Sequence, residues 1–218
     1  MYVGAMEEER IEVVAFACHG TVVNWRDSVE SVLCRTARRH GEAPLDRGRA
    51  LRRALEALPA RSFAEAFERL AAERGYRWAG PGDLALQRAV AGCRSFPDAA
   101  PALEAARAAG VRLVAVSSAD PQLVEAALRP LDGAFDAVLS GGPLARAARA
   151  IGVPANRVLH VAAGTAGLRA AAALGMRAAW LNRRGAPAPD GATYDFEWRT
   201  LEGLSAWLGA QPVGAAPR

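Results

Sequence analysis

The sequence contains no lysine, because all 27 of its basic residues are arginine. Any mechanism that needs a primary amine, such as a Schiff base or a compact ammonium beside a phosphate group, is therefore excluded unless a partner supplies one. With the heavy use of alanine, this bias is typical of a GC-rich bacterial genome.

Cysteine is scarce and long apolar runs are missing. Cys18, Cys34 and Cys93 are widely spaced and form no C-x-x-C pair, so we expect reduced thiols and neither a disulfide framework nor a zinc site. No apolar run reaches the ~18 residues of a membrane helix. Glu7–Glu9 stand where a signal peptide would carry positive charge. We expect a cytoplasmic protein that does not enter membranes.

The chain is long and apolar enough to fold as one large domain or as a domain with an insert. It has 218 residues, of which 51% are hydrophobic and 23% charged. The surplus of positive charge lies in residues 26–92, where Arg alternates with Glu at helical spacing. No aromatic stacking motif accompanies these arginines, so a solvated helical face is favoured and nucleic-acid binding is a remote alternative.

Strand and helix patterns alternate outside residues 26–92. Strands are predicted at residues 12–18, 112–116, 135–139, 157–161 and 177–181, and helices at 101–109, 121–128, 144–151 and up to residue 174. Helical periodicity with Gly and Pro breaks predicts about four helices in 26–92, and residues 208–218 are predicted to be disordered. The alternation predicts an α/β fold with a doubly wound, Rossmann-like parallel sheet, whose ligands bind at the carboxyl ends of the strands.

The strand ends resemble one family in residue type, order and spacing. They are FACHGTVVNW at residues 16–25, LVAVSSAD at 113–120, VLHVA at 158–162, LGM at 174–176 and WLNR at 180–183. Together they resemble the haloacid dehalogenase superfamily, and most of all the branch around the L-2-haloacid dehalogenases, over roughly residues 10–205. The resemblance implies a discontinuous α/β core formed by residues 10–25 and 93–207 and an inserted helical cap at 26–92.

The charged groups that this resemblance implies for catalysis are missing. Ala17 stands where the family has its nucleophilic aspartate, and a methyl group attacks nothing. His19 occupies the place of a second Asp or a Tyr. Ser117 keeps the hydroxyl that the resemblance assigns to the anionic group of the substrate, whereas Ser118 replaces a common Asn. We expect neither dehalogenase nor phosphatase turnover.

Two further segments lack charged members of the family's site. The stretch between Ser140 and Gly152 is short and contains no lysine, and its Arg146 and Arg149 are predicted to face solvent. The loop at residues 162–168 has no carboxylate. Because Mg²⁺ needs carboxylate ligands, we expect no metal, and we expect no other cofactor.

The uncharged groups that the chain keeps at the strand ends predict a site for a small anionic molecule in the cleft between core and cap. The amides around Cys18, His19 and Gly20 can form a nest with the hydroxyl groups of Thr21 and Ser117. The further candidate ligand groups are Ser118 and Trp25, the latter as an apolar wall. His19 is the candidate catalytic residue, because its charge can change near neutral pH.

Structural roles for the same residues stay open. Cys18 is as well explained as a buried, unreactive thiol, and Thr21 and Ser117 as side chains that satisfy backbone groups at turns. Asp120, which precedes a proline, is better explained as a helix N-cap than as a replacement acid, and His160 as support for the fold.

Three hypotheses follow for the function. The first is a catalytically degenerate, non-hydrolytic member of the superfamily that acts as a binding or partner subunit, with a protein partner or a second copy left open. The second is a repurposed, metal-free enzyme of a biosynthetic pathway that catalyses elimination or ring closure on a substrate with a phosphate-type or sulfate-type leaving group. The third is nucleic-acid binding through the Arg-rich cap.

Overall fold

A computed structural model describes residues 10–41, 69, 72–73, 75, 92–188, 190–191 and 193–210. The chain divides into two compact units. The first comprises Met1–Val22, Ser95–Ser118 and Leu131–Arg218, and the second comprises Val23–Arg94 and Ala119–Pro130. The predicted cap boundaries at 26–92 stay a prediction, because most of residues 42–91 lie outside the described residues.

The first unit is built on a six-stranded sheet in the order β3-β2-β1-β4-β5-β6, and every neighbouring pair is parallel. The strands are β1 (Val13–Ala17), β2 (Arg112–Val116), β3 (Ala137–Leu139), β4 (Val158–Ala162), β5 (Arg177–Leu181) and β6 (Phe196–Trp198). From β1 the chain proceeds to β2 and β3 on one side and then returns to β4 on the other. This confirms the predicted doubly wound α/β fold.

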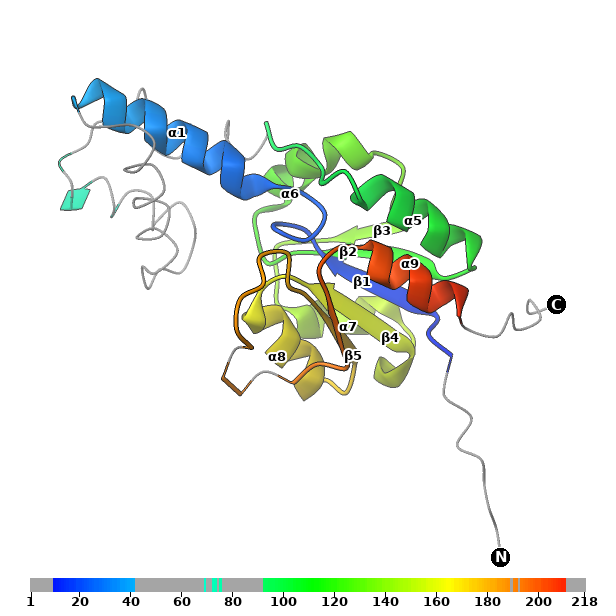
Figure 1. The fold of residues 1–218 in the computed structure, drawn as a ribbon. Helices are drawn as coiled ribbons and strands as arrows, with labels where there is room; N and C mark the ends of the chain where they lie inside the picture. The colour runs from blue at the N-terminus through cyan, green and yellow to red at the C-terminus, as the bar shows by residue number, and fades with distance from the viewer. Residues whose placement is uncertain are drawn as a thin grey trace, which may run out of the picture. The chain divides into compact units, whose positions relative to one another are not determined.

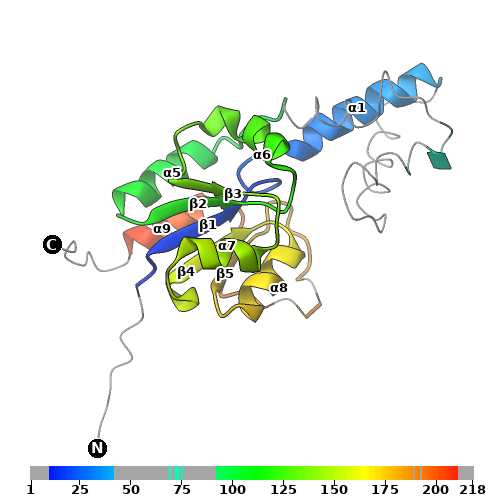
Figure 2. The same cartoon turned by 180° about the vertical axis from the view of Figure 1, so that it is seen from behind.

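Helices cover both faces of this sheet. On one face lie α5 (Ala99–Ala108) and α9 (Glu202–Gly209), and on the other lie α7 (Leu144–Ile151) and α8 (Thr165–Ala173) (Figures 1 and 2). Because both faces are buried, β1 and β4 have continuous apolar runs broken by only one polar residue, His160. Ala15 and Ala162 contact the same apolar cluster as Ile151 of α7 and Leu168 of α8.

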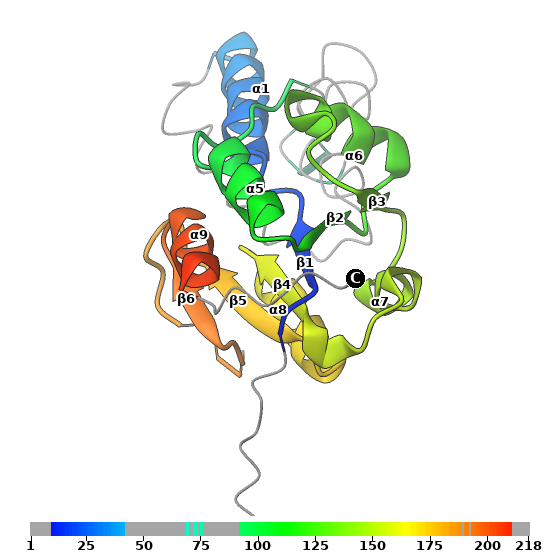
Figure 3. The same ribbon diagram turned by 90° about the vertical axis from the view of Figure 1, so that its right-hand side faces the viewer.

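An aspartate directly precedes each of the two edge strands. Asp136 precedes β3, accepts a hydrogen bond from the backbone N–H of Leu113 at 2.7 Å and donates its own N–H to the Leu113 carbonyl at 2.8 Å. Asp195 precedes β6 and makes the same pair of bonds with Ala178 at 2.7 and 2.8 Å. These paired bonds set the register of both edge strands. β6, beside β5 in Figure 3, is a strand that the sequence patterns did not predict.

The second unit contains α1 (Trp25–Arg39) and α6 (Pro121–Leu128). The side chain of Asn24 caps α1 by accepting from the backbone N–H of Asp27. Asp120 caps α6, with its carboxylate accepting from the N–H of Gln122 at 2.9 Å, which confirms the N-cap interpretation. Two short 3₁₀ helices, Arg129–Leu131 and Ala155–Arg157, complete the described elements.

The prediction that residues 208–218 are disordered is wrong for the first two of them. Leu208 and Gly209 belong to α9, because Leu208 lies one turn after Leu204 and both side chains are buried. Residues 211–218 lie outside the described part of the chain. No helix among the described residues is long and apolar enough to cross a membrane.

Candidate functional site

The carboxyl ends of β1, β2 and β4 meet at the point where the chain changes direction across the sheet. Strand order reverses between β1 and β4, which is where ligands bind in doubly wound folds. Ala17 at the end of β1 is in register with Val116 at the end of β2. The loops that follow these strands therefore form one candidate site within the first unit.

Ala17 places a methyl group at the centre of this edge. The side chain is half-buried and packs against the apolar cluster between the sheet and α7 and α8. It offers neither a nucleophile nor a charge to the site.

Cys18, the next residue, is a buried thiol. Its Sγ–H donates to the carbonyl of Val116 at 3.6 Å, and the side chain is 1% exposed. Burial raises the pKa of the thiol to about 12. Since the thiolate is the nucleophilic form, the Cys18 thiol is unreactive at neutral pH. This agrees with the interpretation of Cys18 as a buried packing residue.

The loop after β1 turns tightly over residues 18–22. The carbonyl of Cys18 accepts from the backbone N–H groups of Thr21 at 3.3 Å and Val22 at 3.1 Å. Gly20 has φ +82°, a left-handed conformation that side chains with a Cβ rarely adopt. The Thr21 and Val22 amides close the turn, and the predicted anion nest at the amides of Cys18, His19 and Gly20 stays a prediction.

Thr21 joins two loops. Its side chain is fully buried, and its Oγ1 accepts from the backbone N–H of Ala163, after β4, at 3.1 Å. The Thr21 hydroxyl thus satisfies a backbone amide of the neighbouring loop, and its role as a ligand group stays a prediction.

His19 is half-buried in the same turn. Burial lowers the pKa of its imidazole below the ordinary value. The ring is thus neutral at physiological pH, so it does not supply the positive charge that an unperturbed histidine gains near pH 6.5. A neutral imidazole retains the ability to accept or relay a proton.

Of the remaining predicted residues, Ser117 lies closest along the chain to the aligned strand ends. It is half-buried directly after β2, and its backbone N–H donates to the carbonyl of Leu139 at 3.0 Å. Ser118 is exposed. Trp25 is half-buried as the first residue of α1 in the second unit, so its predicted role as a pocket wall stays a prediction.

His160 lies inside β4. The side chain is 2% exposed, and its Nδ1 has no hydrogen-bond partner in the described part of the chain. Burial lowers the pKa of the imidazole to about 4, with the backbone of Ala15 opposing part of this shift. On α7, Arg146 and Arg149 are exposed, which confirms that they face solvent.

The donor groups at these strand ends do not suit magnesium. Ala17, His19, Ser117 and Ala163 follow or end the three strands and carry no carboxylate, the ligand that Mg²⁺ prefers. In the ranges that the structure describes, no three residues among His, Cys, Asp and Glu are grouped as metal ligands would be.

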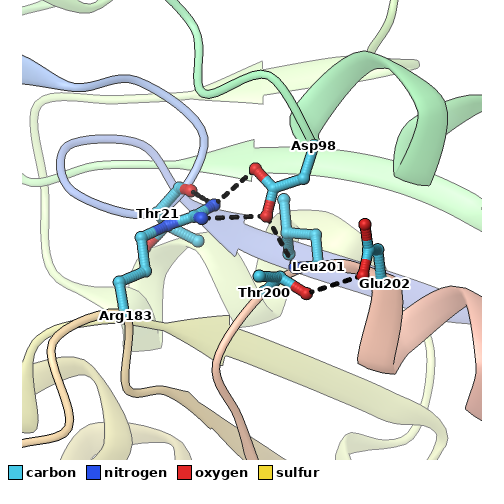
Figure 4. Close-up of polar contacts among 6 residues, drawn as sticks. All are labelled: Thr21, Asp98, Arg183, Thr200, Leu201 and Glu202. Carbon is cyan, nitrogen blue, oxygen red and sulfur yellow. Dashed lines mark hydrogen bonds and ion pairs between the residues drawn. The ribbon is translucent and has the colours of Figure 1, made fainter.

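Two charged residues beside the site were not recognised from the sequence. Arg183, two residues after the end of β5, forms a half-buried ion pair with Asp98, which directly precedes α5, with 2.8 Å between Nη1 and Oδ2 (Figure 4). Each residue lies next to an element boundary that the sequence patterns do indicate, since Arg183 follows β5 and Asp98 precedes α5. Their pairing across 85 positions is not visible in a local pattern.

The comparisons with known proteins agree with this fold. A family model described as a haloacid dehalogenase-like hydrolase matches residues 11–175. None of the curated proteins matches this sequence. Among solved structures, the L-2-haloacid dehalogenase from Xanthobacter autotrophicus with covalently bound chloropropionic acid is 21% identical, with a TM-score of 0.71 over 93% of this chain and 100% of that one.

Two other solved structures show the same fold. A protein described only as a dehalogenase is 21% identical, with a TM-score of 0.77 over 93% of this chain and 99% of that one. A HAD phosphatase from Thermococcus onnurineus is 21% identical, with a TM-score of 0.65 over 92% of this chain and 99% of that one. The chain belongs to the haloacid dehalogenase-like hydrolase family, and its fold is that of the L-2-haloacid dehalogenases.

Proposed function

We propose that this chain is a non-hydrolytic member of its family that binds a small anionic molecule at the carboxyl ends of β1 and β2. The observation that carries the proposal is Ala17. Its methyl group ends the central strand and packs against the apolar cluster. A hydrolase of this family needs a carboxylate at that place to attack carbon or phosphorus, and a methyl group forms no covalent intermediate.

Among the residues that the structure describes, Cys18 directly follows Ala17, and its thiol does not replace the missing nucleophile. The Cys18 thiol is protonated at neutral pH because burial raises its pKa to about 12. The whole sequence contains no lysine to neutralise a transferring group. Since members of a concerted catalytic group are strongly non-additive, losing several of them together leaves no basis for ordinary turnover.

The backbone supports binding of an anion. The consecutive amides of His19 and Gly20 follow the end of β1 in the turn at residues 18–22, and consecutive amides of this kind favour negative charge. Ser117 adds a hydroxyl from the aligned end of β2. With alanine in place of an aspartate, no carboxylate at position 17 repels a phosphate, sulfate or carboxylate group.

The test compares the shift in melting temperature caused by inorganic phosphate in wild type and in Ser117→Ala. Phosphate that binds only the folded state raises the melting temperature by mass action, and the shift should shrink in the variant. Ser205→Ala, a half-buried serine in α9, is the matched control for general salt effects and should retain the full shift. Equal shifts in all three proteins would refute the nest.

The second candidate function is metal-free catalysis of elimination or ring closure on a substrate with an anionic leaving group. It is favoured by His19, because burial lowers the pKa of this imidazole and keeps it neutral and able to accept a proton. With a candidate substrate in hand, His19→Gln should abolish turnover and leave the melting temperature nearly unchanged. Unchanged turnover in that variant would refute proton transfer by His19.

A further inference from the structure

The guanidinium of Arg183 is the centre of a polar network beside the candidate site. Its Nη1 donates to Oδ2 of Asp98 at 2.8 Å, and its Nη2 donates to Oδ1 at 3.0 Å (Figure 4). The backbone N–H of Leu201 donates to the same carboxylate at 2.8 Å. The two charged side chains are only 15% and 12% exposed, so this bidentate pair is sheltered from water and geometrically fixed.

Arg183 also holds the end of the loop after β1. Its Nη2 donates to the backbone carbonyl of Thr21 at 2.8 Å, and its guanidinium carbon lies 3.8 Å from the ring centroid of Phe96. The hydroxyl of Thr21 accepts from Ala163 at 3.1 Å. Thr21 is thus hydrogen-bonded to the loop after β5 through its carbonyl and to the loop after β4 through its side chain.

The start of the loop after β1 is hydrogen-bonded to β2. The Cys18 thiol donates to the carbonyl of Val116 at 3.6 Å, and the Cys18 carbonyl closes the turn onto Thr21. Only His19 and Gly20 lie between these two fixed points. The direction in which their amides point therefore depends on where Thr21 is held.

The charge of Arg183 is directed to Asp98. Burial alone would raise the pKa of the Asp98 carboxyl, but the hydrogen bonds from Arg183 and Leu201 and the guanidinium charge outweigh it and hold the pKa below its ordinary value. Asp98 is therefore ionised at neutral pH and balances the guanidinium. Any effect of Arg183 on an anion in the nest acts through loop geometry rather than through a spare positive charge.

We propose that Arg183 is a positioning residue that fixes the anion-binding amides of His19 and Gly20 by holding Thr21, with Asp98 fixing the guanidinium in turn. The proposal rests on the proposed function for its ligand. It explains how a loop without a charged side chain keeps one geometry. It also predicts that the network and the nest are coupled, although neither Arg183 nor Asp98 touches the ligand.

The experiment uses Arg183→Lys and Asp98→Asn, with Arg157→Lys as a matched control on the exposed ion pair with Glu12. Titration calorimetry with inorganic phosphate gives the affinity, and amide hydrogen exchange of the unliganded protein gives the protection of residues 18–22. Arg183→Lys should weaken phosphate binding roughly tenfold and speed exchange at 18–22 by at least as much, because the bidentate pair and the bond to Thr21 cannot both form. The control should change neither quantity.

Asp98→Asn separates positioning from direct charge attraction. The substitution frees the guanidinium charge, so a ligand-binding arginine would bind phosphate more tightly, whereas a positioning arginine loses its support and binding weakens. Tighter binding, or unchanged exchange in Arg183→Lys, overturns the proposal. If wild type binds no phosphate, the proposed function fails, but hydrogen exchange still tests positioning by Arg183. Faster exchange at residues 18–22 in Arg183→Lys then supports positioning, and unchanged exchange overturns it. If Asp98→Asn does not fold, the two readouts on Arg183→Lys decide.

Discussion

Lowering the pH should destabilise the protein through His160. This imidazole is 2% exposed, and burial lowers its pKa from 6.5 to about 4. The unfolded chain therefore takes up a proton that the folded protein resists. The contribution to stability is fully present above pH ~6.5 and is lost as the pH falls from there towards 4. Linkage between these two pKa values gives a loss of about 2 kcal/mol at pH 5 and about 3 kcal/mol at pH 4.

The assay is urea denaturation of wild type and His160→Leu at pH 8 and pH 5, followed by circular dichroism. Wild type should lose about 2 kcal/mol more of its free energy of unfolding between these pH values than the variant does. His19 also has a lowered pKa, but it contributes to both proteins and cancels in the comparison. Equal losses in the two proteins would show that His160 is protonated in the folded state, and would refute the reasoning.

Three further substitutions or treatments test side-chain packing and reactivity in the first unit. Gly203→Ala in α9 places a Cβ against the Trp198 ring and should lower the free energy of unfolding by about 1–3 kcal/mol, whereas Gly209→Ala in the same helix meets nothing and should be neutral or slightly stabilising by urea denaturation. Asp195→Ala removes the acceptor that starts β6 and should lower the free energy of unfolding by about 1–2 kcal/mol, with Asn restoring most of it. Cys18 should resist iodoacetamide in the native protein and react after unfolding, as measured by peptide mass spectrometry, because burial raises its thiol pKa.

The sequence predicted the central strands well because both faces of the sheet are covered. A strand buried on two sides must be apolar, and the runs that became β1 and, after its first residue Arg177, β5 show this directly. β6 was missed because it has only three residues, two of them half-buried aromatic rings. Its register depends on Asp195 bonding to Ala178, a contact between segments that no local pattern links.

The candidate site was predicted in part. The positions of Ala17 and Ser117 follow from strand ends, which local patterns locate, and the register of β1 with β2 brings these ends together. The burial of Thr21 and the neutral state of His19 were not foreseen, because both depend on which loops pack around them. Arg183 was missed for the same reason, since its partner Asp98 is far away in the sequence.

The most direct test of the central claim is release of p-nitrophenol from p-nitrophenyl phosphate by gel-filtered protein, with an active phosphatase of this family as the positive control. The account predicts no release above buffer for wild type, and none for Ala17→Asp, because the lysine and the loop acids are still missing. Release that co-elutes with the wild-type protein and disappears with EDTA would contradict the assignment of a non-hydrolytic site.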